Sequence, residues 1–334
     1  MSKPITTEVL PESLCEHRAV KAWGQLQPER VEPDGIEILK LKNKSAVYRL
    51  AGLGPDGSAV IAKRCRTGTA LIERMIHEEF LARLALPALQ CYGFVKEPNG
   101  EFCWLFLEEA AGQAYSPLTA EHVALAGRWL ATIQSTALEA GLELRLPSRE
   151  PSHYLKLLQT THRAVLQHLA NPELRGDDWR VLKAIASQCA VLESHFRDLE
   201  EMCEGAPRTL VHGDFVIKNV RVCSTTTGLA LLVFDWEVAG WGVPATDLAQ
   251  FTGRTVSPDL AAYGSVMEKS GLRLNALALR RLAECGKFFR LIDDIQWASS
   301  FLVFKSYEFL EKPVSYLRFY EPRIAEALQA ARWI

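Results

Sequence analysis

Two stretches of the chain interrupt apolar runs with polar residues in a fixed order. Residues 210–219 read Leu-Val-His-Gly-Asp-Phe-Val-Ile-Lys-Asn, and residues 231–249 read Leu-Leu-Val-Phe-Asp-Trp-Glu-Val-Ala-Gly-Trp-Gly-Val-Pro-Ala-Thr-Asp-Leu-Ala. Phosphoryl transfer needs hard oxygen ligands for metal ions and one carboxylate near the attacking hydroxyl. Asp214, Asn219 and Asp235 are such groups, and each lies next to an apolar run that would hold it in place. Any one of them alone could be a turn residue, so their joint order and spacing carry the interpretation.

In this order and spacing the two stretches resemble the aminoglycoside phosphotransferase and choline kinase superfamily. The pattern of that superfamily runs His-Gly-Asp, four residues, Asn, and then a hydrophobic strand that ends in Asp; the Trp-Glu, Gly-Trp-Gly, Pro and Asp-Leu-Ala elements that follow also match. The resemblance implies that Asp214 is the catalytic base or orients the hydroxyl, and that Asn219 and Asp235 bind magnesium. It implies a structural role for His212, and for Asp247 that of a buried carboxylate that braces the catalytic loop.

The chain before this motif is predicted to form a small α+β domain that closes at Gly112. Period-2 alternation and turn signals predict a hairpin at 36–50 and strands at 59–64, 90–96 and 102–108. Residues 69–86 show helical spacing and are followed by Pro87. These segments give a sheet of about five strands with one helix.

Lys63 ends an otherwise apolar strand and resembles the lysine that pairs with phosphates in kinase-like folds. Without the rest of the pattern, a lysine exposed to water at a strand end would be the simpler interpretation. In the kinase fold, a glutamate on the following helix pairs with this lysine. From its spacing to the last leucines of the helix we expect Glu78 to be this partner, with Glu79 as the alternative.

Two further segments would contact a nucleotide. Residues 42–48 occupy the place of a phosphate-covering loop without its glycine-rich form, so Ser45 and neighbouring backbone amides would touch phosphates, although a plain hairpin turn remains the alternative. Residues 105–112 resemble the family's hinge, where one backbone carbonyl and one backbone amide bind adenine. Here those groups belong to Glu108 and Ala110. An ordinary strand and turn would look similar, so this match counts only together with the others.

From Thr119 onward the periodicity is almost entirely helical. It predicts an N-terminal lobe of residues 1–111 and a helical lobe of residues 112–334 that carries the catalytic loop and the acceptor site. Helix starts are expected at Thr119, Ser152 and Ser257-Pro258-Asp259. Strand-like runs at 208–222 and 229–235 indicate a hairpin embedded in the helical domain. We therefore expect an α+β, two-lobed protein-kinase-like fold, with a small antiparallel sheet and one main helix in the first lobe.

A strongly apolar segment near the C-terminus carries two adjacent carboxylates, Asp293 and Asp294. Side chains one helical turn apart share a face, and burying a carboxylate without a partner is costly. One interpretation is that Arg290, one turn before Asp294, pairs with it. The other is that this segment, together with Glu237, lines the acceptor pocket and attracts a substrate that carries amines.

The composition restricts the class of partner. The chain has 334 residues, of which 48% are hydrophobic, so it can bury the cores of about two domains. With 38 basic and 40 acidic residues, the formal charge of −2 gives no general electrostatic reason to expect nucleic acid or an anionic membrane. The eight cysteines show no zinc-type spacing, and no stretch resembles a signal peptide or a membrane span. These features favour a cytoplasmic protein with a small-molecule partner.

The combined expectation is a small-molecule kinase that uses ATP and Mg²⁺ to phosphorylate a hydroxyl of an aminoglycoside-like antibiotic, a sugar or an amino alcohol. A protein kinase would place a long peptide-docking segment after its metal-binding Asp, but only eleven residues separate Asp235 from Asp247. The alternative is a catalytically inactive nucleotide-binding regulatory module of the same fold. Such modules usually lack the lysine, the base or a metal ligand, whereas this sequence has all of them. A helical interaction protein would require the motifs to be coincidental.

Overall fold

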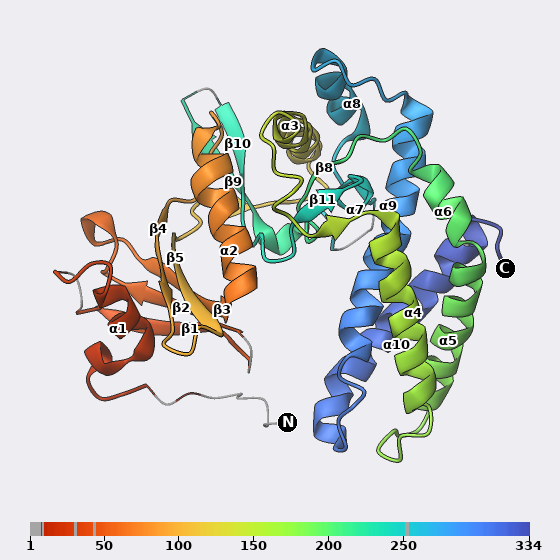
Figure 1. Ribbon diagram of the computed structural model, residues 1–334, viewed down its shortest axis with the longest axis horizontal. Coiled ribbons are helices and arrows are strands. Elements are labelled where there is room, and N and C mark those ends of the chain that lie inside the picture. The colour runs from red at the N-terminus through yellow and green to blue at the C-terminus, as the bar shows by residue number, and fades with distance from the viewer. Residues whose placement is uncertain (1–7, 9, 30–31, 43–44, 227, 251–253) are drawn as a thin grey trace. The chain divides into compact units, whose positions relative to one another are not determined.

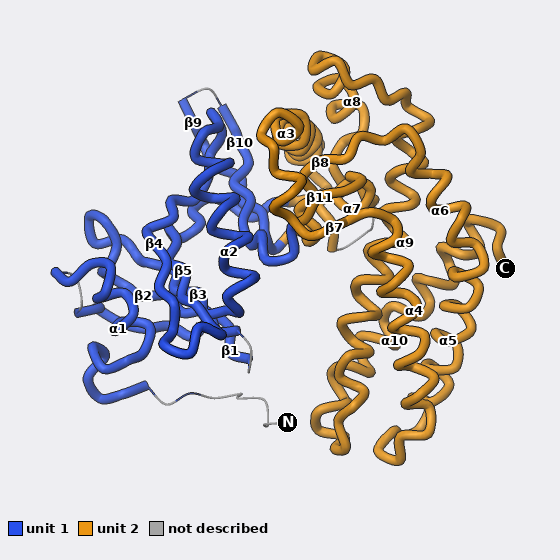
Figure 2. Tube along the Cα trace, in the orientation of Figure 1, with its two compact units in different colours: residues 1–115, 218–239 blue, residues 116–217, 240–334 orange. Residues whose placement is uncertain are grey.

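The structure is a computed structural model that describes residues 8, 10–29, 32–42, 45–226, 228–250 and 254–334 (Figure 1). The chain divides into two compact units, which Figure 2 shows in different colours. Unit 1 comprises residues 1–115 and 218–239, and unit 2 comprises residues 116–217 and 240–334. The first division therefore falls after Tyr115 rather than after residue 111, and a later segment of the chain returns to unit 1.

Unit 1 is built on a five-stranded antiparallel sheet, as the sequence predicts. Its strands are β1 (Gly35–Lys42), β2 (Ser45–Ala51), β3 (Val60–Arg66), β4 (Cys91–Lys96) and β5 (Phe102–Glu108), in the order β1-β2-β3-β5-β4. In β2, alternate side chains are buried, among them Tyr48 and Leu50, because successive residues of a strand point to opposite faces. They pack in one core with Trp104 and Phe106 of β5 and with Trp23 of α1 (Arg18–Gly24).

The helix predicted at 69–86 is shorter and less regular than expected. α2 covers Thr67–Met75, a π-helical turn covers Ile76–Phe80 and a 3-10 turn covers Leu81–Arg83. α2 begins directly after β3, with no connecting loop. Its buried face continues into the π-helical turn through Ala70, Glu73, His77 and Phe80, at the spacing of residues that share one side of a helix. A glutamate is thus turned into the interior, next to β3.

A second, smaller sheet explains why residues 218–239 belong to unit 1. It consists of β6 (Gln113–Ala114), β9 (Val220–Thr225) and β10 (Gly228–Val233), in the order β10-β9-β6. β9 and β10 form a hairpin where one is predicted, but its first strand is shorter than the predicted run 208–222: residues 209–211 belong to a different sheet and residues 217–219 form a 3-10 turn. Gln113 of β6 pairs with Val222 of β9. Gly112 permits this approach: its φ is +120°, and an added Cβ would lie 2.6 Å from the carbonyl oxygen of Val222. The hairpin is therefore attached to the N-terminal chain and is not embedded in the helical unit.

Unit 2 is mainly helical. Its helices are α3 (Ala120–Ala137), α4 (Pro151–His168), α5 (Asp178–Ser194), α6 (Phe196–Met202), α7 (Ala245–Leu248), α8 (Leu260–Lys269), α9 (Ala276–Ser299) and α10 (Tyr307–Ala330). A short sheet joins β7 (Ser148–Arg149), β11 (Gly240–Gly242) and β8 (Thr209–Val211). The predicted helix starts agree closely: Thr119 is the N-cap of α3, α4 begins at Pro151, and the Asp259 carboxylate caps α8 by accepting a hydrogen bond from the N–H of Ala262.

α9 connects the parts of unit 2. It packs against α4, α6, α7, α8 and α10, and with α4, α5 and α10 it forms a bundle of long helices (Figure 1). Gly286 lets α9 approach α7 closely, because a Cβ at this position would lie 1.8 Å from the carbonyl oxygen of Ala245. Arg290, one turn after Gly286 on α9, is therefore held at a fixed distance from the start of α7.

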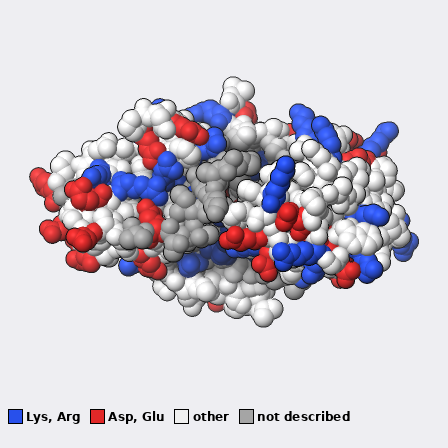
Figure 3. All heavy atoms as spheres, turned by 90° about the horizontal axis from the view of Figure 1, so that it is seen from below, with Lys and Arg blue, Asp and Glu red and all other residues white. Residues whose placement is uncertain are grey.

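The charges on the surface and the hydropathy of the helices bear on the class of protein. Acidic and basic side chains are interspersed over the face shown in Figure 3, as the nearly equal numbers of the two kinds lead one to expect. None of the helices in the described part of the chain is both long enough and apolar enough to span a membrane.

The contact at Gly286 generates the first prediction. Gly286→Ala should lower the free energy of unfolding by about 3 kcal/mol or more, the upper end of the cost of an overpacked core, because the clash is with the backbone of Ala245. Gly264→Ala is the matched control: its Cβ would meet only the end of the Leu279 side chain, at 2.8 Å, so we expect little change. Urea unfolding of both variants measures the difference, and equal changes would contradict the close approach of α9 to α7.

Candidate active site

A buried lysine organises the charged side chains of unit 1. The Nζ of Lys63, on β3, lies 2.8 Å from Oε2 of Glu73 and 3.4 Å from Oε2 of Glu237, and it donates a further hydrogen bond to Asp235. The lysine is 5% exposed. Burial alone would lower the pKa of Lys63, but the three carboxylates raise it well above its usual value. The ammonium group is therefore charged at neutral pH, and the interpretation of Lys63 as a lysine exposed to water is excluded.

The partner of Lys63 on α2 is Glu73, which corrects the expectation of Glu78 or Glu79. Glu73 lies on the buried face of α2 and is 1% exposed. Glu78 lies off this face, in the π-helical turn, where it pairs at 2.7 Å with Nε of Arg74, one turn earlier. The choice of Glu78 rested on its distance from the helix end; the signal that identifies Glu73 is its helical spacing from Ala70, on the side that faces the sheet.

Asp235 and Asn219 lie at adjacent ends of the β9–β10 hairpin. The backbone N–H of Phe234 donates to the carbonyl of Asn219 at 3.1 Å, which brings the two segments together. Asn219 is 3% exposed, and Asp235 has a φ of +70°. This left-handed conformation is strained for a residue other than glycine, and such strain is concentrated at functional sites. Burial alone would raise the pKa of Asp235, but the Lys63 charge lowers it, so the carboxylate is ionised.

The donor set of these two side chains fits a magnesium ion. The described residues contain no group of three or more His, Cys, Asp or Glu side chains that could hold a metal. Mg²⁺ is usually bound by one or two protein carboxylates, with water and substrate phosphates completing its coordination. A carboxylate from Asp235 and an amide oxygen from Asn219 match this requirement, and the resemblance in the sequence assigns the same two residues.

Glu237 belongs to the same cluster. Its carboxylate lies 3.8 Å from Nζ of Lys40 in addition to its contact with Lys63. Asp293 and Asp294, which were expected to line the acceptor pocket together with Glu237, are residues of α9 in unit 2. Its neighbours in unit 1 thus associate Glu237 with the predicted phosphate and metal ligands, and a contact with the acceptor stays a prediction.

The remaining residues predicted to bind the nucleotide also lie in unit 1. Ser45 begins β2 and pairs with Lys42 of β1, whereas Asn43 and Lys44 lie outside the described residues. Glu108 ends β5, and its carboxylate accepts a hydrogen bond at 3.0 Å from the N–H of Gln90. Ala110 lies in the connection from β5 to β6. Their contacts with a nucleotide stay predictions.

In unit 2, the segment 212–214 is held by a buried carboxylate on α7. Asp247 accepts hydrogen bonds from the N–H groups of His212, at 2.7 Å, and Gly213, at 3.0 Å. Nδ1 of His212 accepts a hydrogen bond from the N–H of Asp214, so this side chain also fixes the loop. Burial raises the pKa of Asp247 to about 6. The arrangement agrees with the structural role expected of both residues.

Arg290 of α9 holds the same loop from its other side. Nη1 donates to the carbonyl of Gly213 at 2.6 Å, and Nη2 donates to Oδ1 of Asp214 at 3.2 Å. Nη2 also lies 3.9 Å from Asp294, its neighbour one turn later. The local sequence indicates only this last pairing, because the contact with Asp214 joins residues 76 positions apart.

Both carboxylates that were proposed to line the acceptor pocket have arginine partners. Asp294 lies 3.4 Å from Nη1 of Arg254, and Asp293 lies 3.7 Å from Nη1 of Arg149. Burial raises the pKa of Asp293 to about 6. Arg290 therefore pairs with Asp294, as one of the two interpretations predicts. The negative charges of Asp293 and Asp294 are in addition offset by Arg149 and Arg254, which come from other segments.

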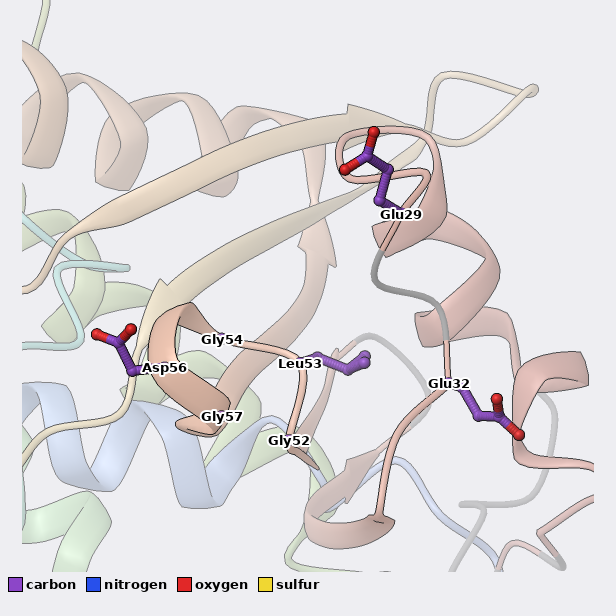
Figure 4. A pocket seen from close by; sticks show the side chains of 7 residues that line it. All are labelled: Glu29, Glu32, Gly52, Leu53, Gly54, Asp56 and Gly57. Atoms are coloured by element: carbon purple, nitrogen blue, oxygen red, sulfur yellow. The ribbon is translucent and has the colours of Figure 1, made fainter.

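A pocket of about 530 Å³ in unit 1 is separate from all of these residues. It is lined by Glu29, Glu32, Gly52, Leu53, Gly54, Asp56 and Gly57. Figure 4 shows that the three carboxylates point in different directions and do not converge on a common point. The pocket has none of the convergent polar groups of a ligand site, so we assign it no role.

The pairing of Lys63 generates the second prediction. Glu73→Gln should lower the free energy of unfolding by about 3 kcal/mol, because it removes the charge of a fully buried partner of a buried ion. The matched control, Glu78→Gln on the same helical segment, should change it by about 0.5 kcal/mol or less, since exposed i,i+4 pairs contribute little. Urea unfolding of both variants measures the difference. A larger effect at Glu78 would restore the original assignment.

The third prediction concerns the pH dependence of stability. The pKa of Asp247 rises from 3.8 to about 6 on folding, so the folded state binds the proton more tightly. This contribution to stability is complete below about pH 4 and is lost as the pH rises through about 6. The free energy of unfolding of the wild type, minus that of Asp247→Asn, should fall by about 2.4 kcal/mol between pH 4 and pH 7. A difference that stays constant or increases would show that burial does not dominate at this site.

Comparison with known proteins now gives the family. Residues 42–283 match the model of the phosphotransferase enzyme family. Similar solved structures include the GDP and kanamycin complex of APH(2")-IIia (14% identity, covering 91% of this chain and 98% of that one, TM-score 0.62). They also include spectinomycin phosphotransferase APH(9)-Ia in complex with ADP and spectinomycin (11%, 94% and 99%, 0.63) and choline kinase from Cryptosporidium parvum (9%, 90% and 91%, 0.57). At these identities the likeness shows the fold, and no curated protein matches the chain. Because the family match covers most of the 334 residues, the chain belongs to the phosphotransferase enzyme family.

Proposed function

We propose that the protein transfers the γ-phosphoryl group of ATP to a hydroxyl group of a small molecule. The observation that carries this proposal is the cluster around Lys63, in which a buried, protonated lysine is paired with Glu73 and with the strained, ionised Asp235. A lysine paired with a helix glutamate, together with an aspartate that holds magnesium, is what kinase-like phosphoryl transfer requires. The cluster also argues against a module that has lost its catalytic groups.

Each residue of unit 1 would have a distinct task in binding the nucleotide. Lys63 would pair with the phosphates while Glu73 keeps its ammonium group in place. Asn219 and Asp235 would hold Mg²⁺, which when bound neutralises phosphate charge. The backbone carbonyl of Glu108 and the N–H of Ala110 would bind adenine. The nucleotide complexes of the similar structures, one with GDP and one with ADP, support a nucleotide substrate.

Asp214 would act on the acceptor. Its carboxylate accepts the proton of the acceptor hydroxyl while the hydroxyl oxygen forms a bond to the γ-phosphorus. The bond from this phosphorus to the oxygen that bridges the β- and γ-phosphates breaks, and ADP leaves with that oxygen. The reaction depends mainly on positioning, which the contacts of Asp247 and Arg290 with residues 212–214 provide.

The acceptor is proposed as a hydroxyl-bearing small molecule without a required positive charge. Of the four carboxylates in this part of unit 2, those at positions 214, 293 and 294 contact arginines, and Asp247 accepts hydrogen bonds from two backbone N–H groups. Because their charges are offset, an excess of negative charge does not select a polyamine here. Kanamycin and spectinomycin in the similar structures, together with choline kinase, set the range of acceptors to be tested.

The fourth prediction tests the reaction. The purified protein with ATP and Mg²⁺ should convert at least one member of a panel of aminoglycosides, sugars and amino alcohols into a product heavier by one phosphoryl group. Asp214→Asn should reduce kcat by about 10²–10⁴-fold, the usual loss of a positioned base, and should leave nucleotide affinity unchanged. Asp235→Ala should instead weaken the Mg²⁺-dependent binding of ATP. Nucleotide binding without any product would favour the regulatory-module alternative, and full activity of Asp214→Asn would refute the role of Asp214.

A further inference from the structure

We propose that Arg290 is a positioning residue that holds the Asp214 carboxylate in the orientation in which it meets the acceptor hydroxyl. The inference deepens the proposed function and rests on it, because Asp214 acts on a hydroxyl only if the protein is a phosphotransferase with this base. It assigns a role in the reaction to a residue that the sequence motif does not contain.

The guanidinium group contacts two consecutive residues of the loop at once. One nitrogen donates to the carbonyl of Gly213 at 2.6 Å, and the second donates to Oδ1 of Asp214 at 3.2 Å. The arginine side chain is 7% exposed, whereas that of Asp214 is 24% exposed. A planar fork that donates to a backbone and a side-chain oxygen fixes both the loop and the carboxylate, which a point charge such as lysine cannot do equally well. Rotation of Asp214 away from this orientation would break one of the two bonds.

Arg290 is itself fixed by the packing of α9. Gly286 lies one turn before it on the same face, and this glycine permits the contact between α9 and the carbonyl of Ala245. Asp247, two residues after Ala245, holds the N–H groups of His212 and Gly213. The loop is therefore held from two sides: Asp247 of α7 accepts hydrogen bonds from its N–H groups, and Arg290 of α9 donates to its carbonyl and carboxylate oxygens. The two helices are in direct contact.

The charge of Arg290 is secured by its surroundings. Burial alone would lower the pKa of this arginine. The negative charges of Asp294, Asp214 and Asp293 outweigh burial and raise the pKa above its usual value. Asp294 lies one helical turn from Arg290 and also contacts Arg254. We therefore interpret Asp294 as a support for Arg290, in place of the acceptor ligand that the sequence suggested.

The competing explanation is that Arg290 is only an ion pair that stabilises the fold. In that case the loss of Arg290 would reduce stability. Any decrease in kcat would then be the same factor in the wild-type and the Asp214→Asn backgrounds. A purely structural pair is available for comparison in the same unit: Arg318 donates to Asp178, which is 1% exposed, at 2.6 Å. Arg318→Gln therefore controls for the loss of an ion pair with a buried carboxylate.

The fifth prediction uses kinetics and a double-mutant cycle. We expect Arg290→Gln to reduce kcat by about 10²-fold, the size of a misplaced reacting group, with little change in the KM for ATP, and Arg290→Lys to restore part of this loss. Arg318→Gln should lower the melting temperature but leave kcat near the wild-type value. In the Asp214→Asn background, Arg290→Gln should cause no further loss of kcat, because the residue through which it acts is already absent.

Two results would overturn the inference. One is a wild-type kcat in a folded Arg290→Gln or Arg290→Lys variant. The other is an equal loss caused by Arg290→Gln in the wild-type and Asp214→Asn backgrounds, which would indicate a structural role. Thermal unfolding of every variant identifies those that fold, and Arg290→Lys supplies the test if Arg290→Gln does not. If the wild type forms no product with any acceptor, the proposed function fails instead, so the two failures are distinguishable.

Discussion

A buried lysine cannot stay charged without a carboxylate beside it, and this constraint determines the arrangement of unit 1. The effective cost of transferring one ion from water into a protein interior is several kcal/mol. Ion pairs offset this cost for Lys63 on β3: one with Glu73, which fixes α2 against the sheet, and two with Asp235 and Glu237, which follow β10. One ammonium group thus joins three segments that are far apart in the chain, among them the residue with a left-handed backbone conformation, Asp235.

Unit 2 uses buried charges in a similar way. The loop that carries Asp214 has buried backbone donors and acceptors that charged side chains from two helices satisfy: Asp247 binds N–H groups, and Arg290 binds a carbonyl. Burial raises the pKa of Asp247 to about 6, so keeping it ionised at neutral pH costs stability. Such a cost is understandable at a site that depends on precise positioning, because stability is commonly lower where a loop must be held in one functional geometry.

The sequence predicted the five-stranded sheet, the hairpin and the order of the motif, because each of these depends on local periodicity or on residues close together in the chain. It did not identify Glu73, although the spacing of the buried face of α2 contained the necessary signal. Arg290 is a different case, since its contact with Asp214 arises from the packing of α9 on α7, and no local pattern carries this information. The same limit applies to Asp293 and Asp294, whose arginine partners come from distant segments.

The pairing of these carboxylates changes how acceptor selection should be understood. An unpaired acidic cluster would attract any cation over a long range, and the choice among amines would then depend mainly on charge. A cluster in which carboxylates and guanidinium groups alternate instead presents fixed hydrogen-bonding groups with little net field. Recognition by such a surface depends on the positions of hydroxyl groups and on shape, because a site built to hydrogen-bond a substrate rejects analogues that leave its polar groups unpaired. Under the proposed function, the geometry around Asp214 and Arg290 would therefore contribute more to the choice of acceptor than net charge.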